Sequence, residues 1–177
     1  MFEEAILHIL KNEGGYVDHK SDPGGATNYG VSLRFLKTLG LYGDFNNDGL
    51  IDGNDIKAMD TEDAKGVYKK FWWDKHKYGQ IKDIRIATKI LDMSINVGSY
   101  RAHCILQNAL NDSGSDLLID GVIGWKTIKE INHHKDKHKL LSHIIANLSK
   151  YYLELYDNDK ENRVNFIVGW LKRATKR

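Results

Sequence analysis

Glu13 and Asp22 are the two carboxylates of this chain whose positions best suit acid–base chemistry. Glu13 follows a helix-like run and is itself followed by Gly14 and Gly15, which end that run. Unpaired carbonyl groups give the C-terminal end of a helix partial negative charge, so a carboxyl group there holds its proton more tightly. A general acid must be protonated near the working pH, and Glu13 therefore suits that role.

The segment after Glu13 is rich in turn residues. Asp22 lies nine positions after Glu13, Thr27 lies five after Asp22, and the run SDPGG between Glu13 and Thr27 favours a sharp reversal. Such a reversal would bring Asp22 and Thr27 across a gap from Glu13. In glycoside hydrolysis one carboxyl group protonates the leaving oxygen, while the second holds a water or stabilises the cationic sugar ring. Asp18 is a rival for the second carboxylate, and an ordinary turn before proline also accounts for Asp22.

The run EGGY followed by VDHKSDPGGATNYGVS resembles the N-terminal signature of glycoside hydrolase family 108, a family of N-acetylmuramidases. The resemblance implies that Glu13 is the catalytic acid. It also implies a mainly α (α+β, lysozyme-like) fold, with a small β-hairpin beside the acid. The spacing of Glu13, Asp22 and Thr27 is similar to a Glu-Asp-Thr arrangement in phage-type lysozymes, which have one more residue before the threonine. This second resemblance implies that Asp22 and Thr27 assist catalysis.

The acidic run DFNNDGLIDGND matches the spacing of an EF-hand calcium loop. Gly49 falls where such a loop turns sharply, and an aspartate takes the last position in place of glutamate. The predicted ligands are Asp44, Asn46, Asp48, the main chain of Leu50, Asp52 and Asp55. We expect a structural Ca²⁺ ion that the chemistry does not require. A solvated Asn/Asp/Gly turn is the alternative account.

Several aromatic and amide residues are candidates for holding a sugar, because aromatic rings pack on the apolar faces of sugars. The predicted substrate-binding residues are Tyr16, Asn28, Tyr29, Trp73 and Asn96. We expect Trp73 and Tyr29 to be the exposed pair, since Trp72 falls on the apolar stripe of its helix. Core packing is the alternative for each aromatic residue, and the satisfaction of helix ends is the alternative for Asn96.

Apolar residues at helical spacing predict a mainly helical chain. After a first helix and a loop or short hairpin over 16–31, Thr61 is expected to cap a helix. The inner face of that helix is expected to hold Ala64, Val67, Tyr68, Phe71 and Trp72. A buried central helix over 83–97 and a helix over 101–110 follow, and the predicted final helices span about 137–156 and 161–174.

The second half carries DMSINVG, HCILQNAL and DGVIGWKT, which resemble parts of the peptidoglycan-binding region that follows the catalytic segment in this family. We therefore expect a catalytic segment over 1–82 and a helical peptidoglycan-binding segment over 83–177. Because no linker separates them, the two are expected to pack as one lysozyme-like unit.

Composition excludes several other classes. The net charge of +2 does not favour nucleic acid, and the lone Cys104 excludes an internal disulfide. The N-terminus is acidic where a signal peptide is basic, and no apolar run is long enough to span a bilayer. We expect a monomer made in the cytoplasm that reaches the cell wall (periplasm or extracellular space), for a phage enzyme by a holin-type route.

Three functions fit these features. The first is a muramidase that cuts the β-1,4 bond between N-acetylmuramic acid and N-acetylglucosamine. The second is a non-catalytic wall-binding or secretion-accessory protein that uses the same cleft, but an intact Glu13 favours catalysis. The third is a calcium-responsive interaction module, which leaves the EGGY segment without a role. The histidines of HHKDKHK lie among lysines, which repel a cation, so a solvated helix start describes them better than a zinc site.

Overall fold

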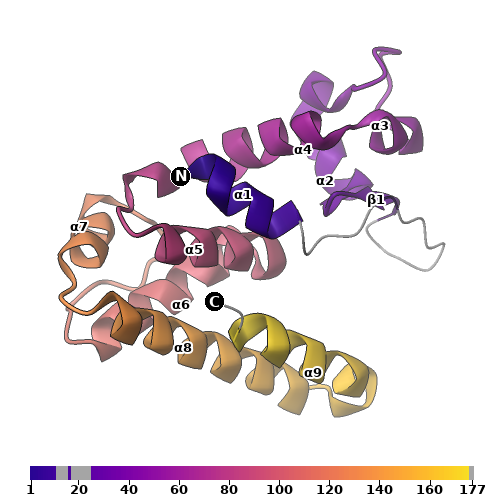
Figure 1. Ribbon diagram of the computed structural model, residues 1–177. Coiled ribbons are helices and arrows are strands. Elements are labelled where there is room, and N and C mark those ends of the chain that lie inside the picture. The colour runs from indigo at the N-terminus through magenta and orange to yellow at the C-terminus, as the bar shows by residue number, and fades with distance from the viewer. Residues whose placement is uncertain (11–15, 17–24, 176–177) are drawn as a thin grey trace. The chain divides into compact units, whose positions relative to one another are not determined.

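The computed structural model describes residues 1–10, 16 and 25–175 of the chain (Figure 1). The described chain divides into two compact units, Met1–Lys75 and His76–Arg177. It is mainly helical, as the sequence predicts, and its described strands form one small hairpin. No described helix has both the length and the apolarity needed to cross a bilayer.

The first unit is built from short helices around one hairpin. Its elements are α1 (Phe2–Leu10), β1 (Thr27–Asn28), β2 (Val31–Ser32), α2 (Leu33–Leu36), the 3-10 segment η1 (Lys37–Gly43), α3 (Gly53–Ala58), α4 (Thr61–Tyr68) and the π-helix η2 (Lys69–Asp74). Helix α1 buries Ala5, Ile6 and Ile9, which recur at the spacing of one helix face. Glutamates in its first turn complement the helix dipole.

The hairpin β1–β2 has a two-residue loop, Tyr29 and Gly30. Both residues have positive φ, 49° and 79° respectively, as a type I′ turn requires. Glycine adopts this conformation freely, whereas tyrosine does so rarely. The Tyr68 hydroxyl of α4 donates a hydrogen bond to the Tyr29 carbonyl at 2.9 Å and so helps to hold this turn.

Helix α4 is capped by Asp60, not by Thr61 as the sequence suggested. The Asp60 carboxylate accepts from the Asp63 N–H at 2.9 Å, and the Asp63 carboxylate accepts from the Asp60 N–H at 3.0 Å. This reciprocal capping box satisfies two N–H groups that would otherwise lack partners, which is why the aspartate takes the cap position. Thr61 is the first residue of the helix itself.

The second unit is a helical bundle. Its elements are the 3-10 turn η3 (Tyr78–Gln80), α5 (Ile84–Val97), α6 (Ser99–Asp112), α7 (Trp125–His133), α8 (Lys137–Asp157) and α9 (Lys160–Thr175). Helix α5 is largely buried, and α6 packs against both α5 and α8. Helices α8 and α9 run side by side as a hairpin of helices (Figure 1).

The end of α9 is tied to the middle of α5. The Lys89 ammonium group, only 5% exposed, donates to the carbonyls of Arg173 and Ala174 at 3.1 and 2.6 Å. The Arg173 guanidinium also pairs with the Asp92 carboxylate at 3.0 Å. Carbonyls at a helix C-terminus lack partners within the helix, so a lysine there both caps α9 and anchors it to the bundle.

Candidate active site and glycan-binding residues

The predicted acid and both candidates for the second carboxylate, Glu13, Asp22 and Asp18, lie outside the described residues. Helix α1 ends at Leu10 and β1 begins at Thr27, so all three belong to the segment that connects these elements. Thr27 is half-buried in β1, and its hydroxyl donates to the Gly25 carbonyl at 3.5 Å. The small hairpin that the family resemblance implies is present, and Thr27 belongs to its first strand.

The two hairpin residues predicted to hold substrate differ in exposure. Asn28 is 7% exposed, and its side-chain amide donates to the carbonyls of Ile56 and Met59 at 3.0 and 3.2 Å. These bonds tie β1 to α3, so the Asn28 amide has a structural role within the first unit. Tyr29 is half-buried at the turn, where its carbonyl accepts a hydrogen bond from the Tyr68 hydroxyl.

Tyr16 is described and 40% exposed. The Lys57 ammonium group of α3 lies 5.8 Å from the centre of its ring, within the range of a cation–π contact. Its exposed ring surface leaves it suited to packing against a sugar.

The expectation that Trp73 is exposed and Trp72 is in the core is wrong. Trp73 is 5% exposed and packs edge-on against Phe2, with ring centres 5.5 Å apart, whereas Trp72 is half-buried against Phe35. The reason is the π-helix η2, which follows α4 directly. A π turn places residue i+5, not i+4, above residue i, so the buried position after Tyr68 falls on Trp73.

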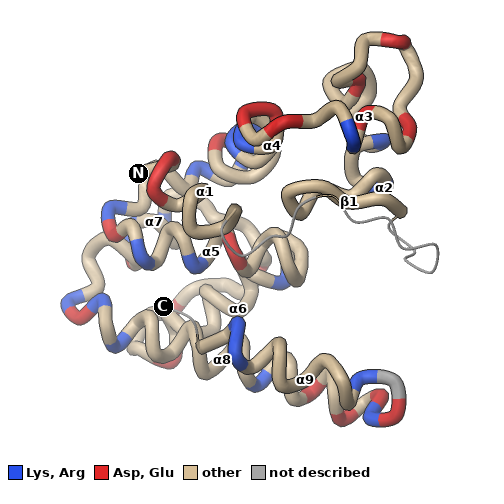
Figure 2. The backbone as a smooth tube through the Cα atoms, turned by 45° about the vertical axis from the view of Figure 1, so that its right-hand side comes forward, with Lys and Arg blue, Asp and Glu red and all other residues tan. Residues whose placement is uncertain are grey.

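Acidic residues recur along the loop before α3 (Figure 2). The Asp44 carboxylate accepts from the N–H groups of Asp48 and Gly49 at 3.1 and 2.9 Å. The Asp48 carboxylate accepts from the Leu50 N–H at 2.8 Å, and Asn46 accepts from the Asp48 N–H at 3.0 Å. These bonds wind the first half of the loop into a turn.

Asp55 closes the same loop from inside. It is fully buried, and its carboxylate accepts from the N–H groups of Phe45, Asn46 and Asp52 at 2.9, 3.3 and 2.7 Å. Its bond to Asp52 is half of a capping box at the start of α3. Within the described ranges, no group of three or more His, Cys, Asp or Glu side chains is arranged to hold a metal ion. A carboxylate can accept about four hydrogen bonds or ligand contacts. The donor types therefore fit calcium, but the loop carboxylates would have to draw together around it.

Asn96 lies at the exposed face of α5, one turn after Asp92. Its amide N–H donates to the Asp92 carbonyl at 2.6 Å, with a longer contact of 3.4 Å to the Asp92 carboxylate. Asn96 lines a pocket of about 420 Å³ with residues of α8 and α9. Sequence reasoning missed the aromatic side of this pocket, which is formed by Tyr151, Tyr152 and Trp170. The sequence hinted at this aromatic side only through the aromatic residues of the last two helices, to which no motif assigns a role.

The DGVIGWKT motif begins with a loop, to which side chains of α6 form hydrogen bonds. The His103 ring is hydrogen-bonded to the Gly121 carbonyl at 2.8 Å, and the Gln107 side chain contacts both Asp120 and the Gly121 N–H, at 2.7 and 2.9 Å. A Cβ on Gly121 would lie 2.4 Å from the Tyr100 ring, and its φ is +71°. The motif is therefore a rigid turn that requires glycine.

The partners of His103 determine which of its ring nitrogens donates a hydrogen bond and which accepts one. The Gly121 carbonyl can only accept, so Nδ1 of His103 carries a proton and Nε2 accepts from the Tyr78 hydroxyl at 2.8 Å. Ser94 lies 2.7 Å from the same hydroxyl. All three side chains are buried, and burial lowers the pKa of His103, so the neutral ring is favoured.

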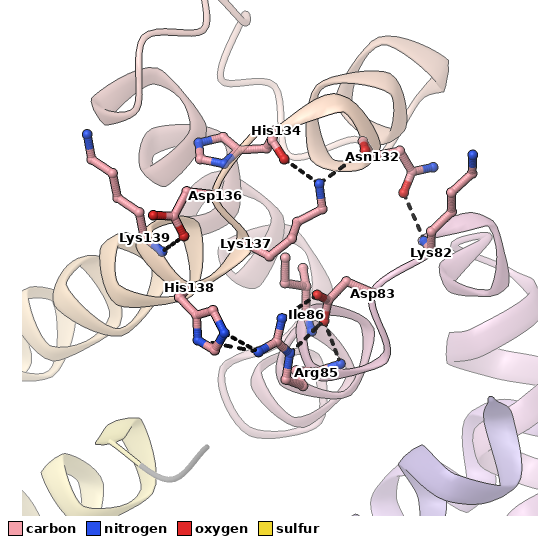
Figure 3. A network of polar contacts seen from close by, with 10 residues as sticks. All are labelled: Lys82, Asp83, Arg85, Ile86, Asn132, His134, Asp136, Lys137, His138 and Lys139. Carbon is pink, nitrogen blue, oxygen red and sulfur yellow. Dashed lines mark hydrogen bonds and ion pairs between the residues drawn. The ribbon is translucent and has the colours of Figure 1, made fainter.

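The histidine-rich junction before α8 is held by ordinary hydrogen bonds (Figure 3). Asp136 caps α8 by accepting from the Lys139 N–H at 2.9 Å, which lowers the pKa of its carboxyl group. The Arg85 guanidinium pairs with Asp83 at 2.6 Å and reaches the His138 ring at 3.0 Å. These contacts stabilise the junction of α5 and α8.

The mainly helical fold with its small hairpin is consistent with a lysozyme-like fold. The model of the family glycosyl hydrolase 108 matches residues 6–98, and that of a predicted peptidoglycan domain matches residues 101–175. The chain belongs to the glycosyl hydrolase 108 family. This confirms the family that the EGGY segment indicated, and peptidoglycan as the target.

The solved structure of Brucella abortus SagA is similar to this chain. The two share 26% identity with a TM-score of 0.69, and the match covers 98% of this chain and 92% of that one. The similarity therefore spans both units. No curated protein matched the chain.

Proposed function

We propose that this protein is a muramidase that cleaves the β-1,4 bond between N-acetylmuramic acid and N-acetylglucosamine, with Glu13 as the general acid. The observation that carries the proposal is the glycosyl hydrolase 108 match over residues 6–98, which includes the EGGY segment. Glu13 follows the end of α1 by three residues, and the hairpin that the resemblance implies follows at Thr27. The peptidoglycan domain over residues 101–175 supports the choice of substrate.

Each site residue then has a distinct task. Glu13 protonates the leaving glycosidic oxygen, Asp22 stabilises the positive charge that develops on the sugar ring or holds the water, and Thr27 orients that water. Tyr16 and Tyr29 offer ring surfaces to the sugar. Asp18 is the competing second carboxylate.

The test compares the parent with Glu13→Gln on purified peptidoglycan. We expect the variant to keep its thermal melt and to lose lysis, because glutamine cannot give up a proton to the leaving oxygen. Loss of a general acid lowers rates by about 10²–10⁴-fold. Turbidity measures lysis, and mass analysis of the fragments should find the new reducing ends on muramic acid.

Glu4→Gln is the matched control, since Glu4 is an exposed carboxylate on α1. Lysis by Glu13→Gln at the parent rate would show that another group is the acid. If neither parent nor variant lysed the wall but both sedimented with it, the protein would be the non-catalytic wall-binding alternative. Asp22→Asn and Asp18→Asn, measured side by side, distinguish the two candidates for the second carboxylate.

We also infer a structural calcium ion in the loop before α3. Asp44, Asn46, Asp48 and Asp52 would supply side-chain oxygens and Leu50 its carbonyl. Asp55 would join them at the inner end. The ion would neutralise the carboxylates of this loop (Figure 2) and fix the segment between η1 and α3. It takes no part in bond cleavage.

A further inference from the structure

We propose that the pocket between α5, α8 and α9 binds an N-acetylated amino sugar of the glycan strand. This inference rests on the proposed function and deepens it, because it adds a sugar site within the second unit. The pocket encloses about 420 Å³, which falls in the usual range for small-ligand sites. It is lined by residues of three helices, among them Asn96, Val97, Tyr151, Tyr152, Trp170 and Arg173.

The aromatic wall of the pocket is rigid. Tyr152 stacks on Trp170 with ring centres 5.4 Å apart and planes 23° from parallel, and Phe166 stacks on the same indole at 5.9 Å. Tyr152 is 4% exposed, so it holds the Trp170 indole in place, and the half-buried rings of Tyr151 and Trp170 supply the accessible surface. A fixed aromatic surface suits the apolar faces of a sugar ring, because no side-chain freedom is lost when the sugar binds.

The polar wall is also pre-oriented. Two contacts with Asp92 fix the Asn96 amide through its N–H group, and none of the described residues donates to its carbonyl oxygen. That oxygen is a suitable acceptor for the N–H of an acetamido group. The Arg173 guanidinium is held at the pocket by bonds of 3.0 and 3.3 Å to the Asp92 carboxylate.

Charge favours the sugar over the peptide stem. The lining holds one cationic group, Arg173, and its charge is balanced by Asp92. A pocket with little net charge gains little from the carboxylates of a stem peptide, whereas a neutral N-acetylated sugar needs only hydrogen bonds and ring contact. The structure therefore favours the glycan strand as the ligand.

Gly169 supplies a sharp test, since it lines the same pocket. A Cβ added there would meet nothing within 4 Å, and Gly169 lies inside α9. Gly169→Leu should therefore add apolar volume at the pocket lining, and leucine favours a helix more than glycine does. Asn165→Leu is the matched control, because it adds the same side chain to an exposed position of α9 one turn earlier.

The experiment titrates the full chain, carrying Glu13→Gln so that nothing is cut, with triacetylchitotriose. The side-chain N–H signal of Trp170 in the NMR spectrum, identified from Trp170→Phe, reports binding at this pocket. We expect that signal to shift in a saturable way. Gly169→Leu should weaken the binding at least tenfold with no loss of melting temperature, while Asn165→Leu leaves it unchanged. Asn96→Ala should weaken it severalfold.

The proposal would be overturned if the Trp170 signal did not shift with the sugar, or shifted only with a stem peptide. Unchanged sugar binding in Gly169→Leu would also overturn it. Lysis by the parent is measured separately. If the parent does not lyse the wall but Trp170 responds, the muramidase assignment fails and the pocket stands. If the parent lyses the wall and Trp170 does not respond, only the pocket proposal fails.

Discussion

Tyr29 shows how a single strained residue can point to a function. Its φ of 49° is costly for a residue with a bulky side chain, and the Tyr68 hydroxyl helps to hold it there. Strain of this kind persists where the surrounding structure enforces it, and it is often found at binding sites. Asn28, its neighbour, is instead committed to holding α3. Of the two, Tyr29 is the better candidate for a sugar contact.

The variant Tyr29→Asn distinguishes the effect of the strained backbone from the effect of the tyrosine ring. Asparagine tolerates positive φ better than tyrosine, so the melting temperature should stay the same or rise slightly. Lysis should fall about tenfold, because the ring surface is lost. Tyr29→Phe keeps the ring and should lyse at close to the parent rate. Full lysis by Tyr29→Asn would remove Tyr29 from the substrate site.

Lys89 links one residue to the pH dependence of stability. Burial lowers its pKa from 10.5 to about 8 in the folded chain. Between these values the unfolded chain binds more protons, so stability rises as pH increases from about 8 to 10.5. This lowering of the Lys89 pKa corresponds to about 3 kcal/mol of stability at most.

Lys89→Met removes this titration while keeping a long side chain. We expect the parent to gain stability relative to Lys89→Met as pH rises from 8 to 10.5, measured by urea unfolding at each pH. A constant difference between the two proteins across this range would show that Lys89 titrates at its ordinary pKa. Lys150→Met, on the adjacent helix α8, is a control for an exposed lysine.

At the scale of elements, the hydrogen bonds between α6 and the DGVIG loop depend on the neutral form of His103. Burial lowers the pKa of His103 below its ordinary 6.5. A lowered folded pKa gives stability that is fully present above 6.5 and is lost as pH falls through the folded value. Acid should therefore loosen the contact between α6 and the motif loop.

His103→Gln tests this dependence, because glutamine can donate to the Gly121 carbonyl and accept from Tyr78 but does not titrate there. We expect the parent to lose melting temperature between pH 7.5 and 5, and the variant to lose less. Thermal melts over that range measure both. An equal slope in the two proteins would assign the acid sensitivity to other groups.

The π-helix η2 shows where periodicity misleads. A repeat of 3.6 residues extended from Tyr68 predicts burial of Phe71 and Trp72, and both are only half-buried. The wider turn moves burial to Trp73, which meets Phe2 of α1. Nothing in the local sequence distinguishes a π turn from an α turn, because the choice follows from how the aromatic rings pack.

At the scale of the whole molecule, calcium should act as a stabilising ligand. Binding to the folded chain alone adds about 2.7 kcal/mol when free calcium is 100 times the Kd. For a chain of this size that corresponds to about 5–10 °C in melting temperature. We expect such a rise in millimolar calcium, with chelator as the reference. Asp44→Ala should remove most of the rise while changing the calcium-free melt little.

Asp55→Ala provides the contrast. Because the buried Asp55 carboxylate holds three main-chain N–H groups, its loss should destabilise the chain even without calcium. No calcium-dependent shift in the parent would leave the loop as a turn closed by Asp55. If the rise appeared equally in Asp44→Ala, calcium would bind elsewhere.

The sequence alone determined the features that depend on local interactions. Helix periodicity located α1, α4, α5, α6, α8 and α9 but not α3 or α7. The EGGY segment indicated the family and, through it, the hairpin, because each of these signals lies within a few neighbouring residues. Only the tertiary structure could decide contacts between distant residues. It buried Trp73 and placed the Asn28 side chain in hydrogen bonds to α3. It also brought Asn96 into the same pocket as Trp170 and Arg173, which are far from Asn96 in the sequence. Such contacts follow from how the helices pack, and no local pattern records them.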